Sequence, residues 1–131
     1  MFVDASAWTT ILLSEPEAET FRLKLTDAEI VMTSAMATWE TIRAVGREAV
    51  GDFREVTDSV VALQKLAAAR IISIGEAEQE AAIEAHVRFG KGRHPAKLNM
   101  GDCFAYACAR THGMPLLYKG DDFALTDIEP A

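Results

Sequence analysis

Met1-Phe2-Val3-Asp4, at the start of the chain, consists of three apolar residues followed by a carboxylate. A short apolar run of this kind is typical of a strand buried in the centre of a parallel sheet. Asp4 then falls at the carboxyl end of the strand, which is the edge of the sheet where α/β proteins bind ligands. N-capping of the following helix explains an aspartate at this place equally well.

Beyond this first strand, apolar strand-like runs alternate with helical patterns along the chain. Further strands are expected over Glu29–Met32, Arg70–Ile74 and Pro115–Tyr118, with a weak fifth over Leu125–Ile128. Helices are expected over Ala5–Leu13, from a Ser14 N-cap to about Leu25, from Ser34 to Glu48, from Asp52 or Phe53 to Ala69, over Glu76–Phe89, and from an Asn99 N-cap to Gly113. This alternation predicts an α/β fold in which helices cover both faces of a central, mostly parallel sheet of four to five strands.

Length and composition indicate one globular unit. The chain has 131 residues, of which 50% are hydrophobic, so a single domain over residues 1–131 can form its own core. No apolar run approaches the roughly 18 residues of a membrane span, and the first residues lack the pattern of a secretory signal. Cys103 and Cys108 are five residues apart in one expected helix, which predicts reduced thiols in a cytoplasmic protein without membrane contact.

The formal net charge of −7 argues against a protein that binds nucleic acid through a broad basic surface, and no direct binding to DNA is expected. The charge is unevenly distributed, however. The stretch 85–101 contains no acidic residue but does contain Arg88, Lys91, Arg93 and Lys97. A bound cation would also cancel part of the negative charge. The pattern therefore leaves room for an RNA substrate that contacts one basic loop.

Glu40 is an acid where the helical pattern favours an apolar residue. Three of its four neighbours at helical spacing are apolar, namely Met36, Ala37 and Ala44, so Glu40 lies on or beside the core-facing stripe. A carboxylate there is unfavourable unless it is paired or bound to a metal. An ion pair with the fourth neighbour, Arg43, is the ordinary explanation.

Three more acids lie at the ends of expected elements. Asp102 is third in the helix that Asn99 caps, where an acid ordinarily complements the helix dipole. Asp121 and Asp122 follow the last clear strand and are equally consistent with an ordinary turn. Together with Asp4, these acids fit a hard-cation site, because Mg²⁺ and Mn²⁺ take oxygen ligands.

Convergence of several carboxylates requires a neutralising partner. At about 5 Å and an effective dielectric near 20, each ionised pair repels by roughly 3 kcal/mol. A divalent cation, or an arginine from a partner protein, would remove that repulsion. Raised carboxylate pKa values are therefore predicted for the metal-free protein.

Four motifs, in the right order and at the right intervals, resemble the PIN-domain ribonucleases, and among these the VapC toxins of bacterial toxin–antitoxin pairs. The motifs are Met1-Phe2-Val3-Asp4-Ala5-Ser6-Ala7, Trp39-Glu40, Leu98-Asn99-Met100-Gly101-Asp102-Cys103-Phe104-Ala105-Tyr106-Ala107 and Leu116-Leu117-Tyr118-Lys119-Gly120-Asp121-Asp122-Phe123. The resemblance covers essentially the whole chain. It implies a three-layer α/β/α sandwich, a Mg²⁺- or Mn²⁺-dependent endoribonuclease, inhibition by a cognate antitoxin, and a homodimer within the toxin–antitoxin complex.

The resemblance also implies roles for single residues. Asp4, Glu40 and Asp102 match acids that hold the metal and act in catalysis, with Glu40 holding a metal directly or positioning the attacking water. The fourth acid corresponds to the turn at residues 121 and 122, that is, to Asp121 or Asp122, and the match does not choose between them. Ser6 matches a position that orients a ligand or phosphate.

The expected reaction is hydrolysis of RNA phosphodiester bonds, with the cation lowering the pKa of a bound water and stabilising charge on the phosphate. Lys91, Arg93 and Lys97 are expected to hold the RNA backbone. The alternative for this basic loop is a solvated connector.

Three other functions share some of these features. A receiver-type signalling module also has an α/β pattern and an acidic Mg²⁺ pocket, but it needs an aspartate at the end of the third strand, where this chain has Ile74-Gly75-Glu76. An aspartyl phosphatase usually carries a second aspartate two residues after the first, where this chain has Ser6. A PIN-like domain that binds RNA without cleaving it is the third alternative.

Overall fold

The structure is a computed structural model that describes residues 1–48 and 52–131. Its sheet contains β1 (Phe2–Val3), β2 (Met32–Ser34), β3 (Arg70–Ile72) and β4 (Leu116–Leu117). The strand order is β3-β2-β1-β4, and every neighbouring pair is parallel. The predicted parallel sheet is therefore confirmed, with β1 in its interior and β3 and β4 at its edges.

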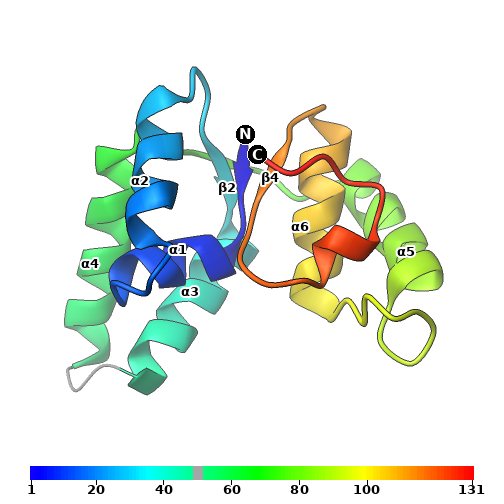
Figure 1. Cartoon of the computed structure of the whole chain (residues 1–131), viewed down its shortest axis with the longest axis horizontal. Helices are drawn as coiled ribbons and strands as arrows, with labels where there is room; N and C mark the ends of the chain where they lie inside the picture. The colour runs from blue at the N-terminus through cyan, green and yellow to red at the C-terminus, as the bar shows by residue number, and fades with distance from the viewer. Residues whose placement is uncertain (49–51) are drawn as a thin grey trace.

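Helices cover both faces of this sheet (Figure 1). On one side lie α1 (Ala5–Leu12), α2 (Ala18–Asp27), α3 (Ala35–Glu48) and α4 (Phe53–Leu66). On the other side lie α5 (Glu76–Phe89) and α6 (Met100–Thr111). The arrangement confirms the expected three-layer α/β/α sandwich. No helix within the described ranges is long and apolar enough to cross a membrane.

β1 and β4 each contribute to two apolar clusters, because successive strand residues point to opposite faces of the sheet. Phe2 and Leu116 pack towards α5 and α6, whereas Val3 and Leu117 pack with Trp8 and α2. All five of these side chains are at most 2% exposed. Two residues from each of β1 and β4 are thus enough to bury both faces.

Cys103 and Cys108 are buried in α6 and are not joined to each other. Burial raises the pKa of the Cys103 thiol to about 11 and that of the Cys108 thiol to about 12. Both thiols therefore remain protonated at neutral pH and pack as small apolar side chains.

Two predicted element starts are wrong. Ser14 does not cap α2: it has a positive φ of 52°, and the helix begins at Ala18, three residues after Glu15, the predicted first helical residue. The strand predicted over Glu29–Met32 lies over Met32–Ser34 instead. Ser34 does open the next helix as predicted, because α3 begins at Ala35 and the Ser34 hydroxyl accepts a hydrogen bond from the Ala37 N–H at 3.1 Å. In both cases, the tertiary position of the loop decides the boundary.

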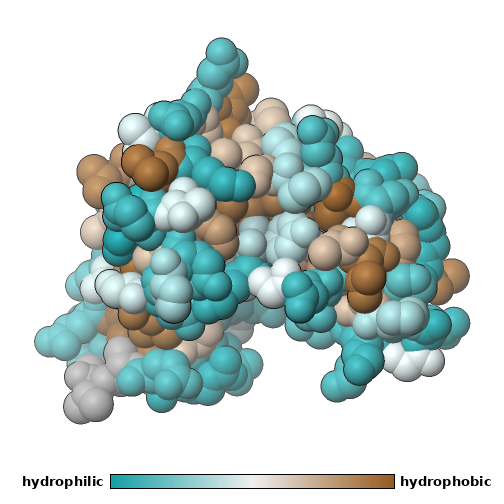
Figure 2. Space-filling model, in the orientation of Figure 1, coloured by the Kyte–Doolittle hydropathy of each residue, from teal (hydrophilic) through white to brown (hydrophobic). Residues whose placement is uncertain are grey.

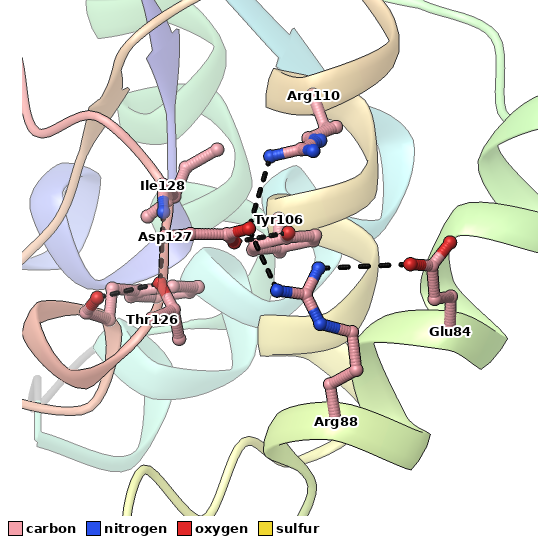
Figure 3. A network of polar contacts seen from close by, with 8 residues as sticks. Glu84, Arg88, Tyr106, Arg110, Thr126, Asp127 and Ile128 are labelled. Atoms are coloured by element: carbon pink, nitrogen blue, oxygen red, sulfur yellow. Dashed lines mark hydrogen bonds and ion pairs between the residues drawn. The ribbon is translucent and has the colours of Figure 1, made fainter.

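The weak fifth strand over Leu125–Ile128 is also wrong. Phe123–Leu125 is a short 3₁₀ helix, η1, and the chain returns to the sheet only at Pro130, which forms one parallel bridge with Leu116. Asp127 explains the difference, because its carboxylate is hydrogen-bonded to side chains of α5 and α6 (Figure 3).

The Asp127 carboxylate accepts three hydrogen bonds from α5 and α6 (Figure 3). The Tyr106 hydroxyl donates at 2.6 Å, the Arg88 guanidinium at 2.8 Å and the Arg110 guanidinium at 3.4 Å. The Tyr106 hydrogen bond, together with the two arginines, holds the pKa of Asp127 below its usual value. The final segment of the chain is thereby fastened to the helices beside it.

Candidate active site

Asp4 leaves the carboxyl end of β1 and becomes the N-cap of α1, where its side chain accepts the Ser6 N–H at 2.9 Å. The side chain is almost fully buried, with 4% exposed. Burial raises the pKa of the Asp4 carboxyl, while the hydrogen bonds from Ser6 act in the opposite direction. Asp4 therefore has both of the roles considered for it, because the carboxylate that caps α1 also lines a cavity.

Glu40 projects from α3 and is half-buried. Its pKa is raised to about 7, first by burial and then by the charges of Asp4 and Asp102. The Arg43 guanidinium counteracts this only weakly, and no Glu40–Arg43 ion pair is formed within the described residues. The ordinary helix ion pair is thus replaced by repulsion from two acids that lie far away in the sequence.

Asp102 occupies the first turn of α6 and forms a capping box with Asn99. The Asn99 N–H donates to Asp102 Oδ2 at 2.8 Å, and the Asp102 N–H donates to Asn99 Oδ1 at 3.1 Å. Burial, together with the charges of Asp4 and Asp122, raises the pKa of Asp102 to about 6, while the Asn99 hydrogen bond acts in the opposite direction. Asp102 therefore has the expected capping role, and the pKa of the same carboxyl is raised by the charges of Asp4 and Asp122.

These three acids line one cavity of about 400 Å³ beyond the carboxyl ends of β1 and β4. The lower margin of the surface in Figure 2 is hollowed between the end of α3 and the start of α6, with mainly hydrophilic residues around it. Polar residues from five segments complete the wall: Ser6, Thr9, Thr10, Glu15, Arg47, Asn99 and Lys119. The Thr9 hydroxyl is buried there and has no hydrogen-bond partner within residues 1–48 and 52–131.

The carboxylates share this cavity without forming a tight, preformed set of three ligands among the described residues. Asp4 is held by Ser6 and Asp102 by Asn99, and mutual repulsion favours separation while no cation is bound. The charges of Asp4 and Asp102 nevertheless raise the pKa of Glu40, and the charge of Asp4 raises the pKa of Asp102, so the three acids are electrostatically coupled. The carboxylate oxygens of Asp4, Glu40 and Asp102 in one cavity are ligands of the kind that Mg²⁺ or Mn²⁺ takes.

Asp121 and Asp122 lie in the turn after β4, and both are exposed. Neither lines the cavity. They differ in the groups that they influence: the charge of Asp122 raises the pKa of Asp102, whereas that of Asp121 raises the pKa of the Tyr118 hydroxyl. Asp122 is therefore the member of the pair that is electrostatically linked to the site.

Ser6 connects the segments that follow β1 and β4. Its hydroxyl donates to Asp4 Oδ2 at 2.6 Å and accepts the Lys119 N–H at 3.0 Å. The Lys119 ammonium in turn lies 2.9 Å from Glu15 and 3.2 Å from Glu17. The end of β4 is thus fixed to α1 and to the loop before α2.

The predicted RNA-binding loop does not reach the carboxylate cavity. Lys91, Arg93 and Lys97 are exposed, and none of them lines it. Lys91 instead borders an apolar groove between α5 and α6. The cations in the wall of the carboxylate cavity are Arg47 and Lys119, which sequence reasoning missed. Arg47 could have been found, because it follows Glu40 by seven residues and so lies two turns along the same helix face.

Comparison with known proteins places the chain beside PIN-domain ribonucleases. The family sequence model described as PIN domain matches residues 1–129. A VapC ribonuclease of Rhizobium meliloti (strain 1021) is 37% identical over 142 residues, covering 97% of this chain and 98% of that protein. Ribonuclease VapC30 of Mycobacterium tuberculosis is 37% identical over 129 residues, covering 98% of this chain and 95% of that protein.

One solved structure has the same fold. The crystal structure of Mycobacterium tuberculosis VapC20, described as a sarcin–ricin-loop-cleaving toxin, matches with a TM-score of 0.77. The match covers 99% of this chain and 97% of that chain, at 20% sequence identity. At this identity, the likeness shows the architecture alone.

Proposed function

The chain belongs to the PIN-domain family, and on that premise we propose that it is an endoribonuclease, the toxin of a toxin–antitoxin pair, that hydrolyses RNA phosphodiester bonds. The relatives that it matches over nearly its whole length carry the name VapC ribonuclease. The observation that carries the proposal is the electrostatic coupling of Asp4, Glu40 and Asp102 around one cavity at the carboxyl edge of the sheet. We further propose that residues 1–131 form one PIN domain.

Asp4, Glu40 and Asp102 would hold a divalent cation, Mg²⁺ or Mn²⁺, with Asp122 as the fourth acid. Asp122 is preferred to Asp121 because its charge raises the pKa of Asp102. When bound, the cation activates water and neutralises charge on the phosphate. Asp121, whose charge acts on the Tyr118 hydroxyl instead, has no role at the cation in this proposal.

The other residues of the cavity would position the reactants. The Ser6 hydroxyl holds one oxygen of Asp4 in place. Glu40, which lines the same cavity as Asp4 and Asp102, would hold the cation directly or position the attacking water through its carboxylate oxygens. Arg47 and Lys119 would contact substrate phosphates, because they are the cations in the cavity wall.

RNA phosphates that lie outside the cavity would be contacted by Lys91, Arg93 and Lys97. The exposure of all three side chains is compatible with that role. Substitution of these three residues should therefore slow the cleavage of a long RNA more than the cleavage of a short oligonucleotide.

We propose a cognate antitoxin as a partner, because an arginine inserted into an acidic cavity can form bidentate hydrogen bonds with its carboxylates. We also propose that the toxin forms a homodimer within that complex, does not itself bind DNA, and acts in the cytoplasm, where its buried, protonated thiols would remain reduced.

The test is cleavage of total cellular RNA by the purified protein with Mg²⁺, Mn²⁺ or EDTA, followed by mapping of the cut ends. Asp4→Asn and Asp102→Asn should each reduce the rate at least about 100-fold while the fold is retained, because each removes a charge that the cation requires. Asp58→Asn, which changes an exposed acid on α4, is the matched control and should cleave like the wild type. Full activity in either site variant would exclude the metal site, and RNA binding without cleavage by the wild type would indicate a non-cleaving domain.

A further inference from the structure

Gly101 lies in the first turn of α6, where the backbone conformation does not require a glycine. Its φ lies outside the left-handed region that favours glycine, and the residue is helical and buried. Glycine is also the least favourable helix residue apart from proline. The glycine is therefore explained by the space that its missing side chain leaves, and not by its backbone conformation.

The missing side chain leaves room for Glu40. A Cβ atom at position 101 would overlap the Glu40 carboxylate, meeting both of its oxygens and the carboxyl carbon. The carboxylate of α3 thus rests directly against the backbone of α6, next to Asp102. The start of α6 carries free N–H groups and a partial positive charge, which favours an anion at this place.

We propose that Gly101 is a positioning residue that allows the Glu40 carboxylate to stand in the cavity beside Asp102. This inference rests on the proposed function, because it concerns the acid that faces the cation. The clash is with the far end of a flexible side chain, so a methyl group at position 101 displaces Glu40 without moving either helix. The change therefore separates the arrangement of the site from the stability of the fold.

The test compares four proteins: the wild type, Gly101→Ala, Glu40→Ala and the double variant. Mn²⁺ affinity is measured by calorimetry on the free protein, and urea unfolding is measured in EDTA. Gly101→Ala should weaken Mn²⁺ binding roughly 10- to 100-fold, as expected when a group that orients a ligand is changed. Its unfolding midpoint should equal or exceed that of the wild type, because alanine favours the helix.

The double variant is the decisive arm. Once Glu40 has been shortened to alanine, no carboxylate remains to be displaced, so adding Gly101→Ala should cause no further loss of Mn²⁺ affinity. Gly46→Ala on α3 is the matched control: it is also a helical glycine, but its added Cβ would meet only Phe53, at an ordinary 3.9 Å. Gly46→Ala should leave Mn²⁺ affinity and RNA cleavage unchanged.

The outcomes separate the two proposals. Wild-type Mn²⁺ affinity in Gly101→Ala, with weakened binding in Glu40→Ala, would overturn the positioning role and leave the proposed function intact. An additive loss in the double variant would also overturn it, because Gly101 would then act independently of Glu40. Wild-type affinity in Glu40→Ala would overturn the metal role of Glu40 itself.

Discussion

At the scale of single residues, the acids of the site combine a local and a distant role. Asp4 caps α1 by accepting the Ser6 N–H, and the Asp102 carboxylate accepts the Asn99 N–H in the capping box of α6. Each also lines the cavity that Glu40 enters from another helix. The local hydrogen bonds hold these carboxylates in place, so that their mutual repulsion is not relieved simply by rotation of the side chains.

The burial of Glu40 and Asp102, together with the repulsion among the acids, predicts an unusual pH dependence of stability. Glu40 and Asp102 have folded-state pKa values of about 7 and about 6, above the ordinary values of 4.5 and 3.8. The folded protein therefore binds more protons than the unfolded chain between about pH 4 and pH 7, and the free energy of unfolding falls as the pH rises through this window. Allowing for partial exposure, we expect a loss on the order of 2 kcal/mol in EDTA, measured by urea unfolding at pH 5 and pH 8.

The control for this pH dependence is Glu40→Gln, which removes one of the titrating groups. Its stability should vary less between pH 5 and pH 8 than that of the wild type. A wild-type protein whose stability rises over this range would contradict the coupling of the acids.

Ser6→Ala should weaken the site through Asp4. The substitution removes the hydroxyl that donates to Asp4 and accepts the Lys119 N–H. Because the Ser6 hydrogen bond lowers the pKa of Asp4, its loss should raise that pKa further. We expect unfolding to become easier by about 1–2 kcal/mol and RNA cleavage to fall roughly tenfold.

The matched control is Ser59→Ala on α4, where the serine hydroxyl only donates to the Glu55 carbonyl of its own helix. Neither stability nor cleavage should change appreciably in this variant. Equal cleavage by Ser6→Ala and the wild type would exclude an orienting role for Ser6.

At the scale of elements, the first turn of α6 is the most specialised part of the chain. It contains the capping box of Asn99 and Asp102 and, between these residues, the glycine against which Glu40 rests. A helix start offers free N–H groups and a favourable dipole, so acids can be held there at a smaller energetic cost than elsewhere. The site is therefore built on a helix end and not on a mobile loop.

Asn99→Ala tests this role of the helix start. Loss of the cap should destabilise the protein by about 1 kcal/mol, because the Asp102 N–H loses its acceptor. It should also weaken Mn²⁺ binding, because the capping box holds Asp102. Asp52→Ala removes the cap of α4 in the same way, through the Arg54 N–H. It should cost similar stability, as measured by urea unfolding, and leave Mn²⁺ affinity unchanged.

At the scale of the whole molecule, the site exists because three layers meet at one edge of the sheet. α1 and α3 come from one side and α6 from the other, with β1 and β4 between them (Figure 1). Asp127 fastens the final segment of the chain to α5 and α6 (Figure 3).

Tyr106→Phe measures what this fastening contributes. The change removes a 2.6 Å hydrogen bond to a charged acceptor and leaves the ring in the core, where Tyr106 is 3% exposed. We expect a loss of about 1–2 kcal/mol in the free energy of unfolding, with unchanged Mn²⁺ affinity. Tyr118→Phe is the control, since the Tyr118 hydroxyl has no hydrogen-bond partner in the described part of the chain. A smaller effect for Tyr106→Phe than for Tyr118→Phe would show that the fastening contributes little.

Prediction from sequence succeeded where short-range patterns decide the outcome. The strand before Asp4, the Asn99 cap and the Asp52 cap all depend on residues within about four positions of one another. It failed at Ser14 and at the fifth strand, because local patterns there compete with contacts from distant segments such as Asp127.

The sequence by itself determined the alternation of strands and helices, the parallel sheet and the acids at its carboxyl edge, because hydrophobic period and capping are local properties of the chain. Only the tertiary structure decided that Asp122 and not Asp121 is coupled to Asp102, that Arg47 and Lys119 line the cavity, and that Glu40 rests on Gly101. These relations join residues up to more than a hundred positions apart, so they depend on how α3, α6 and β4 meet in space.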